Sequence, residues 1–175
     1  MSALFECIKD DHRKIDDLFT RLRDAPADDL RTRERLFTEV KTLLDWHGHA
    51  EEAIFYPLLD RLDQGGQTQN KLTSAHKQVD QLLDEMADLA IDDAAFADRL
   101  NQVQQMVAQH VKEEEGSVMP QLQSRVSEQD LQEQGEIWTE RREITETAAT
   151  GGGYTGPETR PPPVSPEHRR EETRP

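Results

Sequence analysis

Over the first 144 positions the apolar residues recur at intervals of three and four, the period of an amphipathic α-helix rather than of a β-strand. Proline and glycine are sparse in this stretch, and it contains no β-branched run. Four long apolar stripes are separated by short turns and cover residues 4–22, 30–62, 72–89 and 96–122. Because consecutive helices joined by short connections pack antiparallel, we predict an all-α protein with an up-down-up-down four-helix bundle.

A shorter fifth helix is expected after the bundle. Ser127 with Asp130 three positions later has the pattern of an N-cap, and helical spacing continues to about Ile144. From residue 145 to 175, clusters of glycine and proline replace the apolar stripe, and such a segment cannot bury enough surface to offset its ordering entropy. We therefore predict one domain over residues 1–144 and a flexible, disordered tail over 145–175.

Two prolines interrupt the helical stripes. Pro57 and Pro120 each lie inside an otherwise helical pattern, where a proline removes a backbone donor and clashes with the preceding turn. We expect a kink or a break at both positions.

The charge balance narrows the range of partners. The chain has 36 Asp and Glu against 21 Lys and Arg, a formal net charge of −15, whereas nucleic-acid binding requires a net-basic face. Anionic membrane surfaces are disfavoured for the same reason. The chain has neither an apolar run of about 18 residues nor the pattern of a signal peptide. We predict a soluble cytoplasmic protein that binds neither nucleic acid nor membrane. Its one cysteine also excludes a Cys-rich zinc site.

Six potential metal ligands lie on the stripes that should face the core: His12, His47, Glu51, His76, His110 and Glu114. An unpaired charge in a protein core is costly, so these side chains require either polar partners or a metal ion. A buried polar network is the alternative to a metal site. Any metal would be held by nitrogen and oxygen.

The six residues belong to an internal repeat. The segments 47–57 and 110–120 share the pattern His-x3-Glu-Glu-x4-Pro at an offset of 63 residues, and the segments that begin at His12 and His76 match at an offset of 64. Residues four apart share one helix face, so each histidine and the glutamate after it point the same way. Two such hairpins would bring all six side chains around one centre. Imidazole with bridging carboxylate suits two borderline metals, iron or manganese.

These motifs resemble the haemerythrin-like, or HHE cation-binding, domain over residues 3 to about 125. The resemblance implies a four-helix bundle with a non-haem di-iron centre, with manganese or zinc as the less favoured metals. In it His12 and His47 would bind one iron and His76 and His110 the other. Glu51 and Glu114 would bridge the two. Glu114 is preferred over its neighbour Glu115 because it copies the spacing of Glu51.

The resemblance also implies a function. Family members are associated with binding O₂ or NO, as sensor, store or scavenger, in oxidative or nitrosative stress or in iron handling. A redox enzyme acting on peroxide, O₂ or NO is the alternative. A third possibility is a purely structural metal that stabilises the fold of an interaction domain. A signalling role would need a separate protein partner, which the sequence does not identify.

Asp80 is the one departure from the oxygen-carrying members, which have a fifth histidine at this position, one turn after the third-helix histidine. Asp80 could bind through oxygen or stay outside the ligand set. With two histidines for each iron, both metals would keep open positions, which argues against simple reversible oxygen carriage. The sequence assigns Trp46 and Tyr56 to packing, with the option that either lines the pocket.

Overall fold

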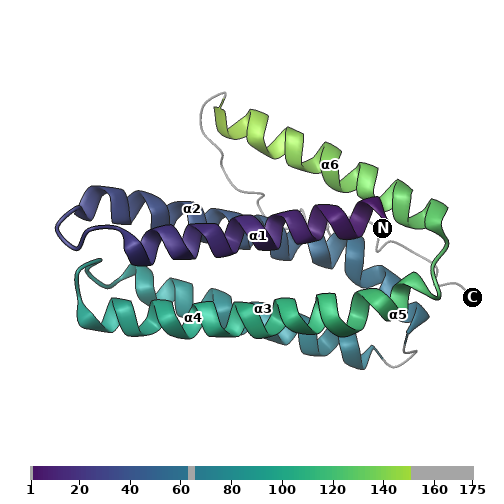
Figure 1. Ribbon diagram of the computed structural model, residues 1–175, viewed down its shortest axis with the longest axis horizontal. Coiled ribbons are helices and arrows are strands. Elements are labelled where there is room, and N and C mark those ends of the chain that lie inside the picture. Colours follow the sequence, from purple (N-terminus) through teal and green to yellow (C-terminus); the bar gives the residue numbers. More distant parts are fainter. Residues whose placement is uncertain (1, 63–65, 151–175) are drawn as a thin grey trace, which may run out of the picture.

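A computed structural model describes residues 2–62 and 66–150, and within these ranges it is helical with no strand. Four long helices run side by side in alternating directions (Figure 1): α1 Ala3–Asp24, α2 Leu30–Ala50, α3 Gln67–Ala87 and α4 Ala94–Glu113. The predicted all-α four-helix bundle is therefore confirmed. No helix of the described ranges is long and apolar enough to cross a membrane.

Side-chain caps fix where several helices begin. The Asp29 carboxylate accepts a hydrogen bond from the Thr32 N–H at 3.1 Å before α2, and Asp93 caps α4 in the same way. Ser127 caps α6 (Glu128–Thr150), because its hydroxyl accepts a hydrogen bond from the Asp130 N–H at 3.0 Å. Such caps satisfy backbone donors that have no partner inside the helix.

Both proline positions change the helix type. After α2 the chain forms a π-helical turn, η1 Glu51–Phe55, and then a 3₁₀ segment, η2 Tyr56–Arg61. After α4 it forms a second π-helical turn, η3 Glu114–Val118, and then α5 Met119–Gln123. Each proline is the second residue after its π turn, and it lacks the N–H that an α-helix would use there. The expected kinks therefore take the form of wider turns that start at the two repeated glutamates.

The apolar core has two parts. One cluster includes Phe5, Ile54 and Leu122, at the end of the bundle where the π turns lie. The other includes Phe19 and Phe96, toward the connections between α1 and α2 and between α3 and α4. The four core histidines come from the levels between these clusters, so a polar layer crosses the bundle with apolar packing on either side of it.

The fifth long helix, α6, is longer than predicted and continues to Thr150, past the expected domain boundary at residue 144. It lies alongside α1 (Figure 1), and Gly135 permits the close approach, because a Cβ there would be 2.7 Å from the Leu4 backbone nitrogen. Trp138, only 1% exposed, is its main anchor in the core. The rest of the predicted tail, residues 151–175, lies outside the described residues.

Candidate metal centre

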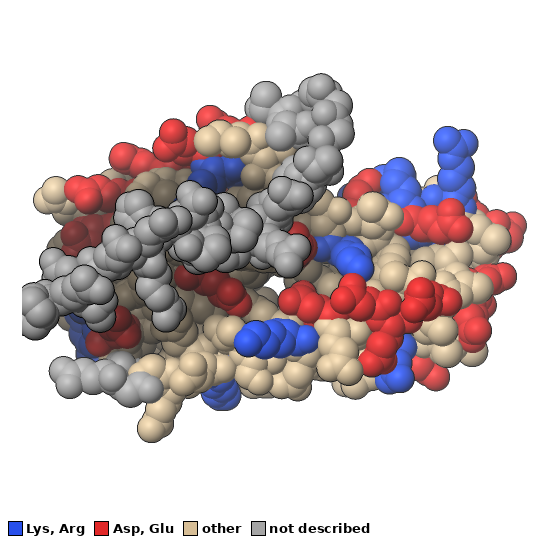
Figure 2. Space-filling model, turned by 180° about the vertical axis from the view of Figure 1, so that it is seen from behind, with Lys and Arg blue, Asp and Glu red and all other residues tan. Residues whose placement is uncertain are grey.

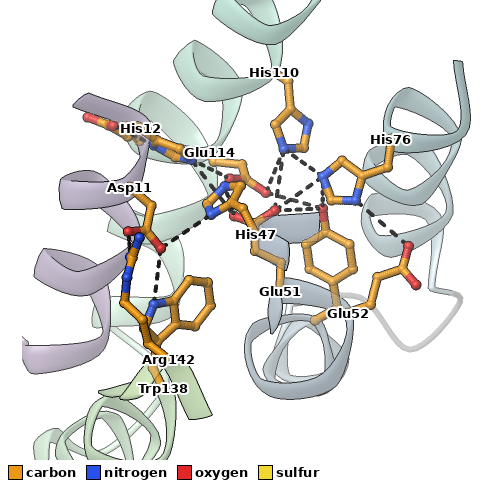
Figure 3. Close-up of polar contacts among 12 residues, drawn as sticks. Asp11, His12, His47, Glu51, Glu52, His76, His110, Glu114, Trp138 and Arg142 are labelled. Carbon is orange, nitrogen blue, oxygen red and sulfur yellow. Dashed lines mark hydrogen bonds and ion pairs between the residues drawn. The ribbon is translucent and has the colours of Figure 1, made fainter. Parts of the chain in front are cut away.

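The bundle brings all six predicted ligands into one cluster (Figure 3). The histidines come from the middle or end of the four long helices, and the two glutamates are the first residues of the two π turns. Glu51 and Glu114 are both 0% exposed; His12, His47 and His110 are buried, and His76 is partly buried. The side chains that helical spacing predicts to face the core thus meet at one place in the bundle.

On one side of the cluster, His47 faces Glu51 and His12 faces both glutamates. His47 Nε2 lies 3.2 Å from Glu51 Oε1. His12 Nε2 lies 3.8 Å from the same oxygen and 3.5 Å from Glu114 Oε2. Nitrogen and oxygen atoms from three helices therefore surround one point.

On the other side, His76 and His110 face the remaining carboxylate oxygens. His76 Nε2 lies 3.2 Å from Glu51 Oε2, and His110 Nε2 lies 3.6 Å from that oxygen and 3.3 Å from Glu114 Oε1. Each glutamate thus directs one oxygen to each histidine pair. This is the arrangement that two bridging carboxylates between two cations would need.

The buried polar atoms of the cluster indicate that a cation fits it. Four atoms that face its centre have no hydrogen-bond partner among the described residues: His12 Nε2, His47 Nε2, Glu51 Oε1 and Glu114 Oε2. A buried polar atom without a partner costs about 1–3 kcal/mol. Two groups of three, His12 with His47 and Glu51, and Glu51 with His76 and His110, have ligand atoms within 4.8 Å of one another. Metal ligation would satisfy these atoms, so the residues fit a metal site.

The pKa values of the two buried carboxylates shift in opposite directions when no metal is bound. Burial, together with the neighbouring Glu51 charge, raises the pKa of Glu114. Burial alone would raise the pKa of Glu51 as well, but the surrounding histidines, His47 foremost, hold it well below its usual range. Burial lowers the pKa of His12, but the Glu114 and Glu51 carboxylates outweigh it and raise this pKa to about 10. His12 is therefore protonated at neutral pH when no metal is bound.

The second glutamate of each His-x3-Glu-Glu motif contacts a histidine of the other hairpin. Glu115 Oε1 accepts a hydrogen bond from His12 Nδ1 at 2.7 Å, and Glu52 Oε1 lies 3.7 Å from His76 Nδ1. The structure thus gives different positions to Glu114 and Glu115, the two candidates for the carboxylate ligand of the second motif. Glu114 faces the centre, and Glu115 lies behind His12, where it fixes the orientation of the ring.

Asp80 lies at a cavity beside the cluster rather than in it. Its exposed side chain lines a cavity of about 190 Å³ that also borders His47, His76 and His110. The contacts that join the six ligands do not include Asp80. The cavity is lined mainly by residues of α2 and α3, so it lies between the histidine and glutamate cluster and the surface of these two helices.

Tyr56 is a residue of the centre that sequence reasoning assigned to packing. Its hydroxyl is 3.1 Å from His76 Nε2, 3.4 Å from Glu114 Oε1 and 3.5 Å from Glu51 Oε2. Burial and the two carboxylate charges raise the pKa of its phenol, which therefore keeps its proton. The repeat did not indicate it, because the matching residue in the second copy is Met119. Its position five residues after Glu51 gave no signal either, because residues five apart point to different faces of an α-helix.

Asp11 is a second polar residue close to the cluster. It is 0% exposed and lies behind His47, with Asp11 Oδ2 at 3.8 Å from His47 Nδ1. Two residues of α6 hold it: Trp138 Nε1–H donates to Asp11 Oδ2 at 3.2 Å, and the Arg142 guanidinium forms an ion pair with Asp11 Oδ1 (Figure 3). The sequence predicted a fifth helix but gave no sign that this helix reaches the site.

Comparison with known proteins agrees with the geometry. The hemerythrin HHE cation binding domain model matches residues 4–122, a range that contains all six ligands. A solved hemerythrin HHE cation binding domain-containing protein from Mycobacterium kansasii superposes with a TM-score of 0.74 at 24% identity, over 86% of this chain and 91% of that one. The match shows that the two share a fold, and its coverage exceeds the residues matched by the family model.

Two curated relatives are also similar. One, named a DNA nickase, from Nostoc sp., is 28% identical over 133 residues, which are 76% of this chain and 36% of the relative. The other is an uncharacterized hemerythrin-like protein of Schizosaccharomyces pombe, 24% identical over 132 residues, which are 74% of this chain and 64% of the relative. The chain thus spans between about a third and two thirds of the length of these relatives.

Proposed function

Because the chain belongs to the hemerythrin HHE cation-binding domain family, we propose that it is a non-haem di-iron protein that binds O₂ or NO. Its role would be that of a sensor, store or scavenger in oxidative or nitrosative stress or in iron handling. The observation that carries the proposal is the division of carboxylate oxygens: Glu51 directs Oε1 to His47 and Oε2 to His76. A single cation would not need this two-sided arrangement.

Residue chemistry supports iron at both positions. His12 and His47 would hold one ion, His76 and His110 the other, and Glu51 and Glu114 would join them. Imidazole suits iron, carboxylate oxygen is a harder donor, and the cluster contains no thiolate. Manganese or zinc would be the alternative metals. When bound, the iron pair would supply open coordination positions and redox electrons for a diatomic ligand.

The protein side chains would control access and protons. The cavity beside His76 and His110 would admit a small molecule, and the apolar clusters on either side of the polar layer would exclude bulk water. Glu115 and Asp11 lie behind His12 and His47 and would orient their rings. The Tyr56 O–H lies among the ligand atoms and would donate a hydrogen bond there.

The alternative function is a redox enzyme that consumes peroxide, O₂ or NO. Tyr56 favours it, because a buried phenol that keeps its proton is a hydrogen-bond donor within 3.5 Å of both carboxylates. Reduction of peroxide or O₂ develops negative charge on oxygen, which a hydrogen-bond donor at this position would stabilise.

The surface supports a small ligand rather than a nucleic acid as the partner. Acidic side chains are spread over the face shown in Figure 2, with basic ones between them, and the full chain carries a net charge of −15. The region similar to the Nostoc protein makes up 36% of that protein. A signalling role would require a separate protein partner.

Metal analysis is the decisive experiment. After expression in iron-replete medium we expect two iron atoms per chain, and His47→Ala and His110→Ala should each lose metal. His49→Ala is the matched control, because the His49 side chain is exposed and its ring bonds to the Asp45 carbonyl. One zinc and no iron would refute the di-iron proposal.

Spectroscopy separates the functional alternatives. An optical change that is stoichiometric with added O₂ or NO supports a binding protein, whereas sustained consumption of peroxide or NO supports an enzyme. A metal-loaded protein whose spectrum responds to none of these would support a purely structural role for the metal. Tyr56→Phe keeps the ring and removes the proton, so it should slow turnover without emptying the site.

A further inference from the structure

The two halves of the site differ in what lies behind their histidines. The repeat matches His12 with His76 and His47 with His110. The residue before the first histidine differs between the two copies: it is Asp11 in the first and Ala75 in the second. Asp11 lies 3.8 Å from His47 Nδ1. Neither His47 Nδ1 nor His110 Nδ1 has a hydrogen-bond partner among the described residues, but of the two only His47 Nδ1 has a carboxylate within 4 Å.

The carboxylates beside His12 and His76 make the two halves of the site differ further. Glu115 bonds to His12 Nδ1 at 2.7 Å, whereas the corresponding Glu52 is 3.7 Å from His76 Nδ1 and is exposed. The His12 and His47 half therefore has a carboxylate behind both rings. The His76 and His110 half has one, and that one lies at the cavity.

Helix α6 holds Asp11 in place. The indole N–H of Trp138 and the guanidinium of Arg142 occupy the two Asp11 oxygens, and Arg142 also lies over the Trp46 ring at 4.8 Å. The Trp138 ring meets the His47 ring edge to face at 5.8 Å. Since α6 lies beyond residues 4–122, this support comes from outside the stretch that the family model matches.

We propose that Asp11 is a positioning residue, held by α6, which makes the metal bound by His47 the more tightly held of the two. A carboxylate behind a ligand histidine fixes the ring orientation and raises the basicity of the nitrogen that binds the metal, and its loss costs about 10- to 100-fold in metal affinity. At 3.8 Å the two atoms are beyond hydrogen-bond length, and a rotation of the His47 ring on metal binding would bring them within it. The inference rests on the proposed two-metal site.

Cobalt binding to the metal-free protein tests the inference. Co²⁺ is added stepwise and followed by absorbance, and the wild type should show a tight and a weaker event. Asp11→Asn should weaken the tight event 10- to 100-fold and leave the weaker one unchanged. That tight event should be the one lost in His47→Ala and retained in His110→Ala. Asp10→Asn is the control: this neighbouring carboxylate is exposed and pairs with Arg13.

A second variant guards against misfolding of Asp11→Asn. Trp138→Phe keeps an aromatic ring in the core but removes the N–H that holds Asp11, so it should weaken the same event by a smaller factor. If both variants leave the tight event unchanged, or weaken both events equally, the inference is wrong. A wild type with a single event would refute the two-metal site, and the effect of Asp11→Asn on that event would still decide the role of Asp11.

Discussion

Raising the pH should destabilise the metal-free protein through His12. This histidine is buried with Glu115 Oε1 at 2.7 Å from its Nδ1 and Glu114 Oε2 at 3.5 Å from its Nε2. Burial lowers the pKa of His12, but the surrounding carboxylates outweigh it and raise the pKa from 6.5 to about 10. In the unfolded chain the imidazole returns to its ordinary pKa, so folding and protonation are linked.

The sign and size of the effect follow from the two pKa values. Because the folded-state pKa is the higher one, the stabilisation is fully present below pH 6.5 and is lost as the pH rises toward 10. One pKa unit corresponds to about 1.4 kcal/mol, so the complete loss amounts to up to roughly 5 kcal/mol. That is comparable with the whole unfolding free energy of a small domain, about 5–15 kcal/mol. Glu114, whose pKa is also raised, contributes in the same direction from about pH 4.5 upward.

Urea unfolding of chelator-treated protein between pH 6.5 and 9.5 measures this loss. His12→Gln should reduce the pH dependence, while His110, whose pKa burial lowers but Glu114 and Glu51 raise by more, keeps part of it. His49→Gln, at an exposed position, should keep the full dependence. Metal-loaded protein should show little dependence, because a bound metal requires the neutral imidazole and replaces its proton. An unfolding free energy that is equal at pH 6.5 and 9.5 in the metal-free wild type would refute the reasoning, as would an undiminished slope in His12→Gln.

Three further changes test other parts of the structure. Asp80→His should place an imidazole at the cavity, one turn from His76, and should therefore raise oxygen binding and lower peroxide consumption. If oxygen binding and peroxide consumption are unchanged in Asp80→His and also in Asp80→Ala, our interpretation of this position is wrong. Gly48→Ala should stabilise the metal-free helix by up to about 1 kcal/mol yet weaken metal binding, because its Cβ would lie 3.3 Å from His76 Nδ1. Unchanged metal affinity in Gly48→Ala would contradict this account. Deletion of residues 151–175 should leave metal content and helicity intact, as circular dichroism can check, and a large fall in melting temperature would contradict it.

The sequence predicted the bundle and its polar cluster because both depend on helical period. His47 and Glu51 sit on one face at a spacing of four, and the second copy, His110 and Glu114, repeats that spacing. Two copies of one pattern are hard to explain by packing alone. The approach of the six side chains within the core is therefore a direct consequence of the apolar stripes that carry them.

What the sequence did not predict depends on contacts between distant segments or on local helix type. Trp138 and Arg142 reach Asp11 across more than 120 positions of the chain, and no periodicity encodes that contact. Tyr56 enters the centre because the helix widens just before Pro57. A proline predicts a disturbance at that point, but it does not specify whether the helix bends, ends or widens.

Each π turn also changes the angular phase of its helix. In a continuous α-helix, residues five apart point about 140° away from each other, so Glu51 and Tyr56 would face different neighbours. The Tyr56 N–H instead bonds to the Glu51 carbonyl, five residues back, and this extra residue in the turn brings both side chains to the same face. An α-helix with the same number of residues would instead turn Tyr56 and every later side chain of that segment by about 100°. The helix type of this short stretch therefore decides which side chains reach the cluster.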